Sequence, residues 1–514
     1  MAGAEADLVV ANAAVYTMDA SRSRARAFAV GNGRFLAVGT NQQAERFAGK
    51  TTKTMDLGGK TVVPGFIDAH AHAMDEGGRE SWIDLGSTAS LGEALGRIRA
   101  AAQSAREATW VVAKNWNESK WPERRYLTRA DLDGASMVHP ILACRIDMHM
   151  ASVNSVALRA AGVPVDAAGY ADGIVKEEAF GLVRDSVGLD AARLAVAFPT
   201  VQSRLHGLGI TAVHDMVSPP MVEAYQRVRH AGRLTIRALL NPYIEGLDHL
   251  ARVGLRTGFG DDALRLGPLK AFSDGSLGAR TAALSEPYDD EPSTSGRLLY
   301  EPTELRALLR RGHAAGFQLA VHAIGDRAID LVAEILASLE DGPERRHRIE
   351  HFELPSEAAL DAMASAGLVA SMQPNFVGDL SQPEGMYASR LGNGRLEANN
   401  PYRKIVARRI PLAFGSDGMP YGPLFGIDSA VNAPFEDQRI GVGDAIAAYT
   451  RGAAYAGGQE RDLGSIEVGK CADFVVLGQD PFAVPRSIAS IPVLLTAVGD
   501  RVVHRREDFI SRHG

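Results

Sequence analysis

The sequence predicts an α/β protein whose central part is a closed parallel barrel. Short apolar runs recur between residues 61 and 414, and most are followed by a segment with apolar residues at helical spacing. Eight such strand–helix units favour a (β/α)8 TIM barrel, although an open parallel sheet fits the same pattern. Both ends of the chain are instead rich in short strands separated by turns, which predicts a second, smaller β domain.

The expected terminal strands share short apolar runs bounded by turn residues such as Asn32-Gly33 and Gly58-Gly59. They are residues 8–10, 14–16, 27–30 and 35–38 at one end, and 472–477, 493–498 and 502–503 at the other. Because both ends show the same pattern of short apolar runs separated by turns, we expect them to form one composite β-sandwich domain from residues 1–60 and 462–514.

The expected barrel occupies residues 61–461. Its eight strands are short and apolar, and they are residues 61–67, 211–214, 235–240, 266–272, 318–322, 348–351, 368–372 and 410–414. Segments 305–315 and 328–339 have apolar residues at helical spacing. The interval between the first two strands is too long for one helical crossover, so residues 80–200 are expected to form an inserted lid or substrate subdomain.

The insertion contains a predicted helix over residues 91–105 and predicted strands at 110–113 and 140–143. An insertion after the first barrel strand would overhang the face on which barrel enzymes build their active sites.

Composition narrows the class of function. Among 514 residues, 55 are Lys or Arg and 62 are Asp or Glu, which gives a net charge of −7, and no long basic run occurs. Nucleic acid and anionic membranes are therefore not expected as partners. The two cysteines, Cys144 and Cys471, suggest a reducing compartment. With no secretory signal or long apolar run in view, we expect a cytoplasmic protein acting on a small molecule.

The most informative motif is Pro-Gly-Phe-Ile-Asp-Ala-His-Ala-His at residues 64–72. Alternate side chains of a strand share a face, so His70 and His72 point the same way. Two neutral imidazoles on one face form half of a site for a divalent transition metal. A pair of structural polar histidines near a turn is the alternative.

Further metal-competent side chains lie at the ends of later predicted strands. In a parallel barrel these ends meet at one face, where catalytic groups gather. In chain order, the candidate groups from five strands are His70, His72, Lys270, His322, His351 and Asp417. Their coincidence with the His-x-His strand predicts one metal site.

These motifs resemble the metal-dependent amidohydrolase superfamily. The stretches that carry the resemblance are residues 64–72, Ile349-Glu350-His351, Gly415-Ser416-Asp417 and the terminal segment 463–477. Within the superfamily, residues 270–281 and the stretch Asp147-Met148-His149 followed by Asn154 resemble the amidohydrolase-3 branch, which includes YtcJ-like proteins and N-substituted formamide deformylase. The resemblance covers nearly the whole chain.

The resemblance implies a distorted (β/α)8 barrel with a composite β-sandwich. It assigns metal binding to the four histidines His70, His72, His322 and His351, and makes Asp417 both a ligand and a proton shuttle. Lys270 falls where binuclear members carry a carboxylated lysine that bridges two ions. An ordinary ammonium paired with a carboxylate such as Asp274 is the alternative, so one or two ions are expected. Zinc is the expected metal, with manganese or iron as alternatives.

Several residues are weaker candidates for substrate contact. The resemblance suggests this role for His149 and Asn154, with a polar turn and an Asn cap as the alternative. Arg280 could clamp a substrate carboxylate or brace its own loop. His214 ends one predicted strand and Gln373 follows another, so both would face the same opening.

The expected activity is hydrolysis of a non-peptide C–N bond by metal-activated water, most simply in a linear amide such as an N-substituted formamide or N-acyl compound. Deamination or cyclic-amide opening by the same site is the alternative within enzymes. A catalytically inactive amidohydrolase-like scaffold is the alternative outside them. Barrels of this kind often form dimers, so a homodimer is a further expectation.

Overall fold

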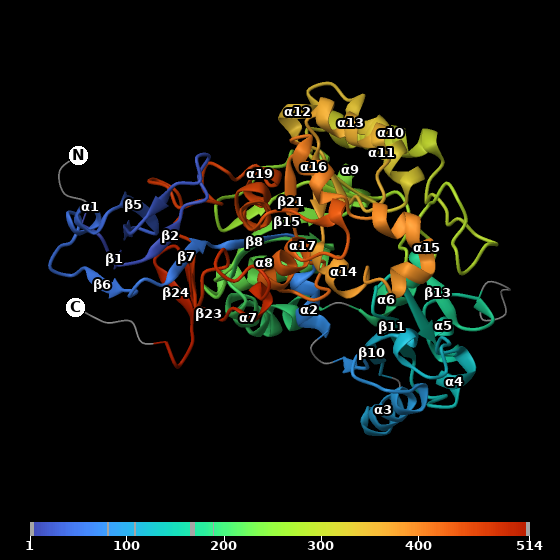
Figure 1. Ribbon diagram of the computed structural model, residues 1–514. Coiled ribbons are helices and arrows are strands. Elements are labelled where there is room, and N and C mark those ends of the chain that lie inside the picture. Colours follow the sequence, from blue (N-terminus) through green and yellow to red (C-terminus); the bar gives the residue numbers. More distant parts are fainter. Residues whose placement is uncertain (1–4, 80–81, 107–108, 165–169, 189, 510–514) are drawn as a thin grey trace.

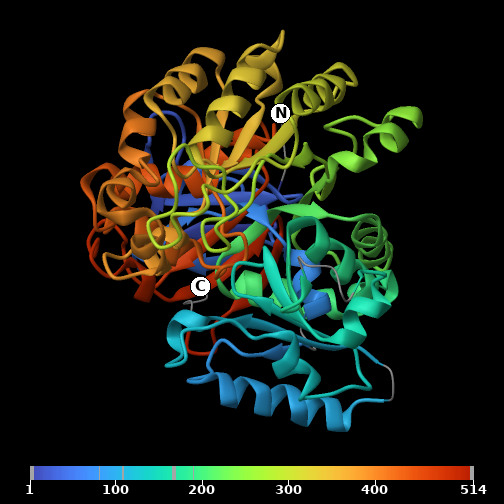
Figure 2. The same cartoon turned by 90° about the vertical axis from the view of Figure 1, so that its right-hand side faces the viewer.

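The computed structural model describes residues 5–79, 82–106, 109–164, 170–188 and 190–509. The strands of residues 8–56 and 474–505 lie toward one extremity of the molecule, and the parallel strands with their helices fill the middle (Figure 1). Figure 2 shows the insertion along one side of the central strands, with the helices of residues 302–366 on the opposite side.

Two parallel sheets form the centre of the molecule. The first has the order β16-β15-β14-β8 and the second the order β17-β18-β19-β20-β21, and every adjacent pair is parallel. The strands are β8 (Phe66–Ala71), β14 (Ile210–Val217), β15 (Arg237–Pro242), β16 (Leu264–Leu266), β17 (Leu269–Phe272), β18 (Leu319–Ala323), β19 (Arg348–His351), β20 (Val369–Met372) and β21 (Leu412–Phe414). The α/β class with parallel strands is therefore confirmed.

The two sheets approach each other at both edges. An isolated parallel bridge joins Tyr243, after β15, to Lys270 of β17. At the other edge the backbone N–H of Asp417, after β21, donates to the carbonyl of His70 in β8 at 2.8 Å. The carboxyl ends of strands from both sheets consequently lie around one opening.

The predicted strand at residues 61–67 is in fact two strands. β7 (Thr61–Pro64) pairs with the terminal strands, whereas β8 pairs with β14 in the central sheet. The chain passes from one sheet to the other at Gly65, where an added Cβ would lie 2.2 Å from Oγ1 of Thr211. Only glycine fits this close approach, and it allows the histidine strand to enter the central sheet.

Helices cover the outer faces of the parallel strands. They are α7 (Ala191–Gly207), α8 (Pro219–His230), α9 (Leu247–Arg252), α10 (Pro302–Ala314), α11 (Asp326–Ala337), α13 (Glu357–Ala366), α16 (Tyr402–Ala407), α17 (Pro423–Val431) and α18 (Val442–Ala447). α13 begins because the Ser356 side chain accepts from the N–H of Ala359, and it ends at Gly367 in the left-handed conformation. The apolar faces of α7 and α8 pack on β14 and β15 in one core, and those of the other helices pack in a second, larger core.

The two ends of the chain form two further sheets with a shared core. One has the order β5-β4-β1-β6 and the other β24-β23-β22-β7-β2-β3. The strands are β1 (Leu8–Ala11), β2 (Ala14–Tyr16), β3 (Arg24–Ala25), β4 (Ala27–Gly31), β5 (Arg34–Gly39), β6 (Lys53–Asp56), β22 (Phe474–Leu477), β23 (Val493–Val498) and β24 (Arg501–Arg505). Phe28 packs edge-on against Phe35 and against Phe474, which links the two ends of the sequence.

The insertion has its own sheet of order β13-β12-β11-β10-β9. Before it, α2 (Ala73–Arg79) packs against α7. The elements of the insertion are β9 (Ile83–Asp84), α3 (Leu91–Ser104), β10 (Val111–Trp116), α4 (Arg129–Asp133), β11 (Ile141–Arg145), β12 (Met150–Val153), α5 (Ser155–Ala160), β13 (Ile174–Lys176) and α6 (Glu177–Val187). The expected helix at 91–105 and the expected strands at 110–113 and 140–143 are present. Among the residues described, no helix is long and apolar enough to cross a membrane.

Candidate active site

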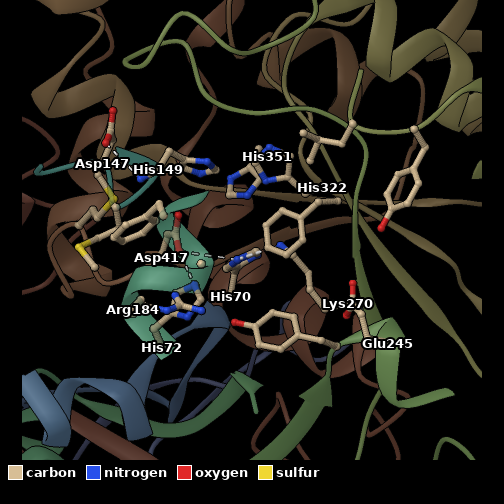
Figure 3. Close-up of a pocket in the computed structure, with 18 of the residues that line it drawn as sticks. His70, His72, Asp147, His149, Arg184, Glu245, Lys270, His322, His351 and Asp417 are labelled. Atoms are coloured by element: carbon tan, nitrogen blue, oxygen red, sulfur yellow. Dashed lines mark hydrogen bonds and ion pairs between the residues drawn. The ribbon is translucent and has the colours of Figure 1, made fainter. Parts of the chain in front are cut away.

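One cavity of about 700 Å³ lies at the carboxyl ends of the parallel strands (Figure 3). All six side chains predicted to bind metal line it: His70, His72, Lys270, His322, His351 and Asp417. The same cavity is lined by residues of the insertion, including His149 and Arg184. Five separate strand ends and the insertion therefore contribute to one site.

The tightest cluster consists of His70, His351 and Asp417, each of which offers a ligand atom within 4.8 Å of the others. Nε2 of His70 is 3.7 Å from Oδ1 of Asp417, and Nε2 of His72 is 2.9 Å from the same oxygen. The ring centroids of His322 and His351 are 4.5 Å apart. This set of imidazoles and one carboxylate has the chemistry of a zinc, manganese or iron site.

The backbone holds two of these ligands in an uncommon conformation. His351 has φ 72° and Asp417 has φ 56°, although neither is glycine. Non-glycine residues in the left-handed region are uncommon and concentrate at functional sites.

Asp417 is brought to His70 by a buried carboxylate in β8. Asp68 accepts hydrogen bonds from the N–H groups of Ser416 at 2.9 Å and His70 at 3.2 Å. The loop between them has no room for a side chain, since a Cβ on Gly415 would lie 2.3 Å from the His70 nitrogen. The sequence Gly-Ser-Asp thus fixes the aspartate against the histidine strand.

Two of the metal-competent imidazoles, those of His70 and His351, are oriented by a hydrogen bond to Nδ1. Nδ1 of His70 contacts Glu350 at 2.5 Å, and Nδ1 of His351 contacts the Gln373 amide oxygen at 2.8 Å. In both rings these acceptors place the proton on Nδ1, so the Nε2 lone pair is available to a metal.

His322 shows the reverse arrangement. Its Nε2 contacts the carbonyl oxygen of Gly275 at 3.0 Å, so Nε2 carries the proton. Its Nδ1 is buried and has no hydrogen-bond partner in the part of the chain that the structure describes. A buried, unpartnered nitrogen costs free energy unless something binds it. A metal ion would satisfy this atom, so the donor set fits a metal.

The electrostatics keep these candidate ligands in the protonation states that metal binding requires. Burial, followed by the charge of Lys270, lowers the pKa of His70 well below its usual value, and burial likewise lowers the pKa of His322 and His351. All three imidazoles are therefore neutral at pH 7. Burial by itself would raise the pKa of Asp417, but the hydrogen bond from His72 and the nearby charges lower it, so Asp417 is ionised.

Lys270 is the one buried lysine in this cluster. Its side chain lies at the cavity wall with Nζ 3.4 Å from Nε2 of His70. Burial lowers its pKa to about 8. An appreciable fraction of the amine is therefore unprotonated in mildly alkaline solution.

His149 reaches this centre from the insertion. Its ring centroid is 5.3 Å from that of His322, and its N–H donates to Asp147 at 3.2 Å. Asp147 pairs with the buried Arg145 at 2.6 Å, which also pairs with Glu118. The predicted position of His149 beside the cavity agrees with the structure, and this ion network fixes the loop that carries it.

Other predicted substrate contacts lie elsewhere, and their roles are corrected here. Asn154 is fully buried and caps α5, because its side-chain oxygen accepts from the N–H of Ala157 at 2.9 Å. Arg280 pairs with Asp290 and donates to the Tyr126 hydroxyl at 3.0 Å, so it braces its loop. Neither residue lines the cavity.

The prediction that His214 and Gln373 contact the substrate is also corrected by the structure. His214 is completely buried behind the metal cluster, where Nδ1 accepts from Arg348 at 2.9 Å. Gln373 supports His351 through the hydrogen bond described above and does not reach the cavity wall. Gln373 thus supports a candidate ligand directly, whereas His214 contacts Arg348, whose partner Glu350 in turn contacts His70.

The sequence patterns did not predict two residues that support His70. Glu350 and Arg348 lie two residues apart on β19, both fully buried, with Nε of Arg348 2.6 Å from Oε1 of Glu350. Two opposite charges at i and i+2 of an apolar strand, directly beside a predicted ligand, were the available signal.

Comparison with known proteins places the chain in a family. The sequence profile described as "Amidohydrolase family" matches residues 53–504. YtcJ of Bacillus subtilis is 29% identical over 96% of this chain and 98% of its own length. N-substituted formamide deformylase of Arthrobacter pascens is 28% identical over 92% of this chain and 94% of its own. A crystal structure described as an uncharacterized metal-dependent hydrolase from Pyrococcus furiosus is similar in fold, with TM-score 0.76, 29% identity, and coverage of 92% of this chain and 99% of that one. The profile match spans well over half of the sequence, and the chain therefore belongs to the amidohydrolase family.

Proposed function

We propose that this chain is a metal-dependent hydrolase that cleaves a non-peptide C–N bond in a linear amide, such as an N-substituted formamide or another N-acyl compound. The observation that carries the proposal is the convergence of His70, His351 and Asp417 on one point, within 4.8 Å, on the wall of a cavity of about 700 Å³. A cavity of this size accepts a small molecule. The similarity to a formamide deformylase supports the choice of a linear amide.

The metal would be held by His70, His72, His322, His351 and Asp417, with zinc as the proposed ion. When bound, such an ion lowers the pKa of water from about 16 to about 7 and polarises a carbonyl. We include carboxylation of Lys270 in the proposal, since its burial and its pKa of about 8 provide the unprotonated amine that reacts with CO2. A carbamate at this position would add oxygen ligands for a second ion.

The protein side chains then handle the proton and the substrate. Asp417 is ionised, so it can accept the proton of the attacking water and return it to the leaving nitrogen. His149, on the opposite wall beside His322, is placed to donate a hydrogen bond to the oxygen of the tetrahedral intermediate. No serine or cysteine nucleophile is needed.

The architecture supports a finer description of the fold within the same proposal. The contacts at both edges of the parallel sheets support one distorted (β/α)8 barrel over residues 61–461, with residues 80–200 as its inserted lid. The shared core of the terminal sheets supports a composite sandwich of residues 1–60 and 462–514. A cytoplasmic location and a homodimer belong to the proposal as well.

The test combines metal analysis with hydrolysis of N-benzylformamide by wild type, His70→Ala and the control His230→Ala, whose histidine is exposed on α8. We expect wild type and His230→Ala to contain at least one equivalent of zinc and to release benzylamine, while His70→Ala loses both. Metal well below one equivalent that does not rise on adding zinc or manganese would support the inactive scaffold. Metal without amide cleavage, but with ammonia release from amino-substituted rings or opening of cyclic ureas, would support the deaminase or cyclic-amide alternative.

A further inference from the structure

The four imidazoles proposed to bind the metal form a row. The ring centroids of His72 and His70 are 5.8 Å apart, those of His70 and His351 are 4.8 Å apart, and those of His351 and His322 are 4.5 Å apart. His72 and His322 are thus the two ends of the row, and Figure 3 shows them on opposite sides of His70. The two inner rings are oriented by side chains that contact their Nδ1 atoms. The two outer rings depend on other contacts.

Asp274 ties the loop that carries His322 to the neighbouring strand. It lies two residues beyond β17 and is fully buried. Its carboxylate accepts from the N–H groups of Ile324 at 3.1 Å and Gly325 at 2.9 Å, which are the second and third residues after His322. The N–H of Ala283 donates to the same carboxylate at 2.9 Å, and Oδ1 lies 3.5 Å from Nε2 of His322. Three main-chain donors and one imidazole therefore surround a single side chain.

The residues on either side of Asp274 hold His322 as well. The N–H and the hydroxyl of Ser273 both donate to the His322 carbonyl, at 3.0 and 2.6 Å. The carbonyl of Gly275 contacts Nε2 of His322 at 3.0 Å. This Ser-Asp-Gly stretch belongs to the segment 270–281, of which the proposed chemistry uses only the lysine. The stretch touches the carbonyl, the ring and the following N–H groups of one histidine, and it leaves Nδ1 of that ring for a metal.

Asp215 supports His72 in the same way. It lies on β14, the strand next to β8, and is fully buried. Its carboxylate accepts from the N–H groups of Ala73 at 2.5 Å and Met74 at 3.0 Å, the first two residues of α2. The Tyr225 hydroxyl donates to the same carboxylate at 2.7 Å. Because a carboxylate is favoured at a helix N-terminus, these bonds fix the main chain directly after His72 to β14.

The main chain of His72 has a second anchor. Its N–H donates to the hydroxyl of Tyr421 at 3.0 Å, and Tyr421 lies four residues after Asp417. The three consecutive N–H groups of residues 72–74 consequently all have acceptors. Ligands must be held within about 0.5 Å of the productive geometry, so a small shift of this main chain would misplace the ring.

Neither aspartate is placed to contact a substrate, because neither Asp215 nor Asp274 lines the cavity. Asp68, which holds the loop of Asp417, shows the same pattern of a buried carboxylate that accepts main-chain N–H groups. A buried carboxylate is costly unless donors satisfy it, so each of these side chains fixes the position of its donors. Three buried aspartates thus each hold the main chain beside one candidate ligand.

We propose that Asp215 and Asp274 are positioning residues of the metal site, and that they present His72 and His322 respectively through the main chain of the loops that carry them. This inference rests on the proposed metal site and adds the groups that set its geometry. Loosening either loop would let one outer ring leave the ion while the inner rings stay in place. Metal affinity would therefore fall even in a chain that keeps its fold.

The test measures zinc affinity by competition with a chromophoric chelator, and the visible absorption of bound cobalt, whose bands depend on ligand geometry. Wild type, Asp215→Asn and Asp274→Asn are each stripped of metal and reloaded. Asparagine keeps the shape of the side chain but turns one acceptor oxygen into a donor. Asp428→Asn is the matched control, because Asp428 also accepts from two main-chain N–H groups, those of Ile488 at 2.8 Å and Ala489 at 3.3 Å, and does not line the cavity.

We expect Asp215→Asn and Asp274→Asn each to weaken zinc binding about 10- to 100-fold and to change the cobalt spectrum, as for loss of an outer partner of a ligand. Asp428→Asn should lower the urea midpoint but keep the zinc affinity and cobalt spectrum of wild type. Wild-type affinity and spectrum in either cavity-side variant would overturn the inference for that residue. An equal loss of affinity in Asp428→Asn would overturn it for both, since the effect would then be general destabilisation.

Two milder changes decide the question if the asparagine variants do not fold. Tyr421→Phe removes the acceptor of the His72 N–H, and Ser273→Ala removes one donor to the His322 carbonyl. Each should weaken zinc binding about 3- to 10-fold, as for one hydrogen bond. Wild-type zinc affinity in both would show that the main chain of these loops does not position the outer rings.

All of these measurements are made without substrate, which separates the inference from the proposed reaction. A wild type that binds zinc but cleaves no amide would contradict the proposed reaction, while the affinities of the variants would still decide the roles of Asp215 and Asp274. Amide cleavage by wild type together with unchanged affinities in the variants would overturn the inference alone. A wild type that binds neither zinc nor cobalt would overturn both.

Discussion

The salt bridge beneath His70 gives the most discriminating prediction. Glu350 accepts from Nε of Arg348 at 2.6 Å and from its Nη2 at 2.9 Å, and contacts Nδ1 of His70 at 2.5 Å. Both members of the ion pair have side chains that are 0% exposed. Glu350→Gln keeps the shape of the side chain but removes its charge, which leaves the Arg348 guanidinium buried without a counter-ion.

Two magnitudes follow from this geometry. Removing one partner of a buried pair costs about 3–5 kcal/mol of unfolding free energy, because the remaining charge is uncompensated. Removing the carboxylate that orients a metal-binding histidine lowers metal affinity by about 10- to 100-fold, or about 1.4–2.7 kcal/mol. We therefore expect Glu350→Gln to be both less stable and a weaker zinc binder than wild type.

The assays are urea unfolding of the metal-free protein and competition for zinc against a chromophoric chelator. The double variant Arg348→Met/Glu350→Met is the control, since it removes both charges. Its loss of unfolding free energy should be smaller, by more than about 1 kcal/mol, than the summed losses of Arg348→Met and Glu350→Met. Glu350→Gln with wild-type zinc affinity and stability within about 0.5 kcal/mol would refute the idea that this pair orients His70.

Three further predictions concern other parts of the molecule. Asp417→Asn should lower kcat for N-benzylformamide by about three orders of magnitude and change KM little, because a proton acceptor acts mainly in the transition state. Steady-state kinetics measure both constants, and an unchanged kcat would show that Asp417 is not the proton acceptor. Burial lowers the pKa of His206 from 6.5 to about 4, so the unfolded chain binds more protons than the folded one between these values. The contribution of His206 to the unfolding free energy should be complete above about pH 6.5 and decline by about 3 kcal/mol as the pH falls to about 4. Urea unfolding midpoints of His206→Gln should therefore lack this part of the pH dependence. A pH profile with the same slope as that of wild type would contradict this. Asn154→Ala should cost about 2–4 kcal/mol of unfolding free energy, because it removes the α5 cap and leaves the Ile141 N–H and the carbonyls of Ser136 and His139 without this partner. The value of kcat/KM for N-benzylformamide should stay unchanged, whereas a large rise in KM would restore Asn154 as a substrate contact.

The positions of the candidate metal ligands were predictable because the local sequence carries the signal for them. An apolar run that ends in His-x-His places both imidazoles on one face, and parallel strands share one edge. These two rules predicted that His70, His322 and His351 lie close together, and the structure places all three around one cavity. The alternation of strands and helices predicted the α/β class for the same reason, since each unit is encoded within a short stretch of chain.

The failures of the sequence-based predictions have a common cause. Asn154 and Arg280 are polar residues in loops, and their composition fits a substrate contact as well as a structural bond. Asn154 caps a helix in the insertion, and Arg280 pairs with Asp290. A side chain that can accept or donate satisfies whichever partner the fold brings within 3 Å or so, and that partner is not adjacent in the sequence.

By itself, the sequence determined the parallel α/β architecture, the set of metal-competent side chains and membership of a hydrolase family, because periodicity and motif spacing are local properties. Only the tertiary structure decided which nitrogen of each histidine faces the cavity, that Glu350 and Arg348 hold His70 from behind, and that Arg184, Glu245 and Arg297 reach the same cavity. These arrangements depend on distances between residues far apart in the chain. Hydrogen bonds and charges act over a few ångströms of space, whatever the number of residues between them.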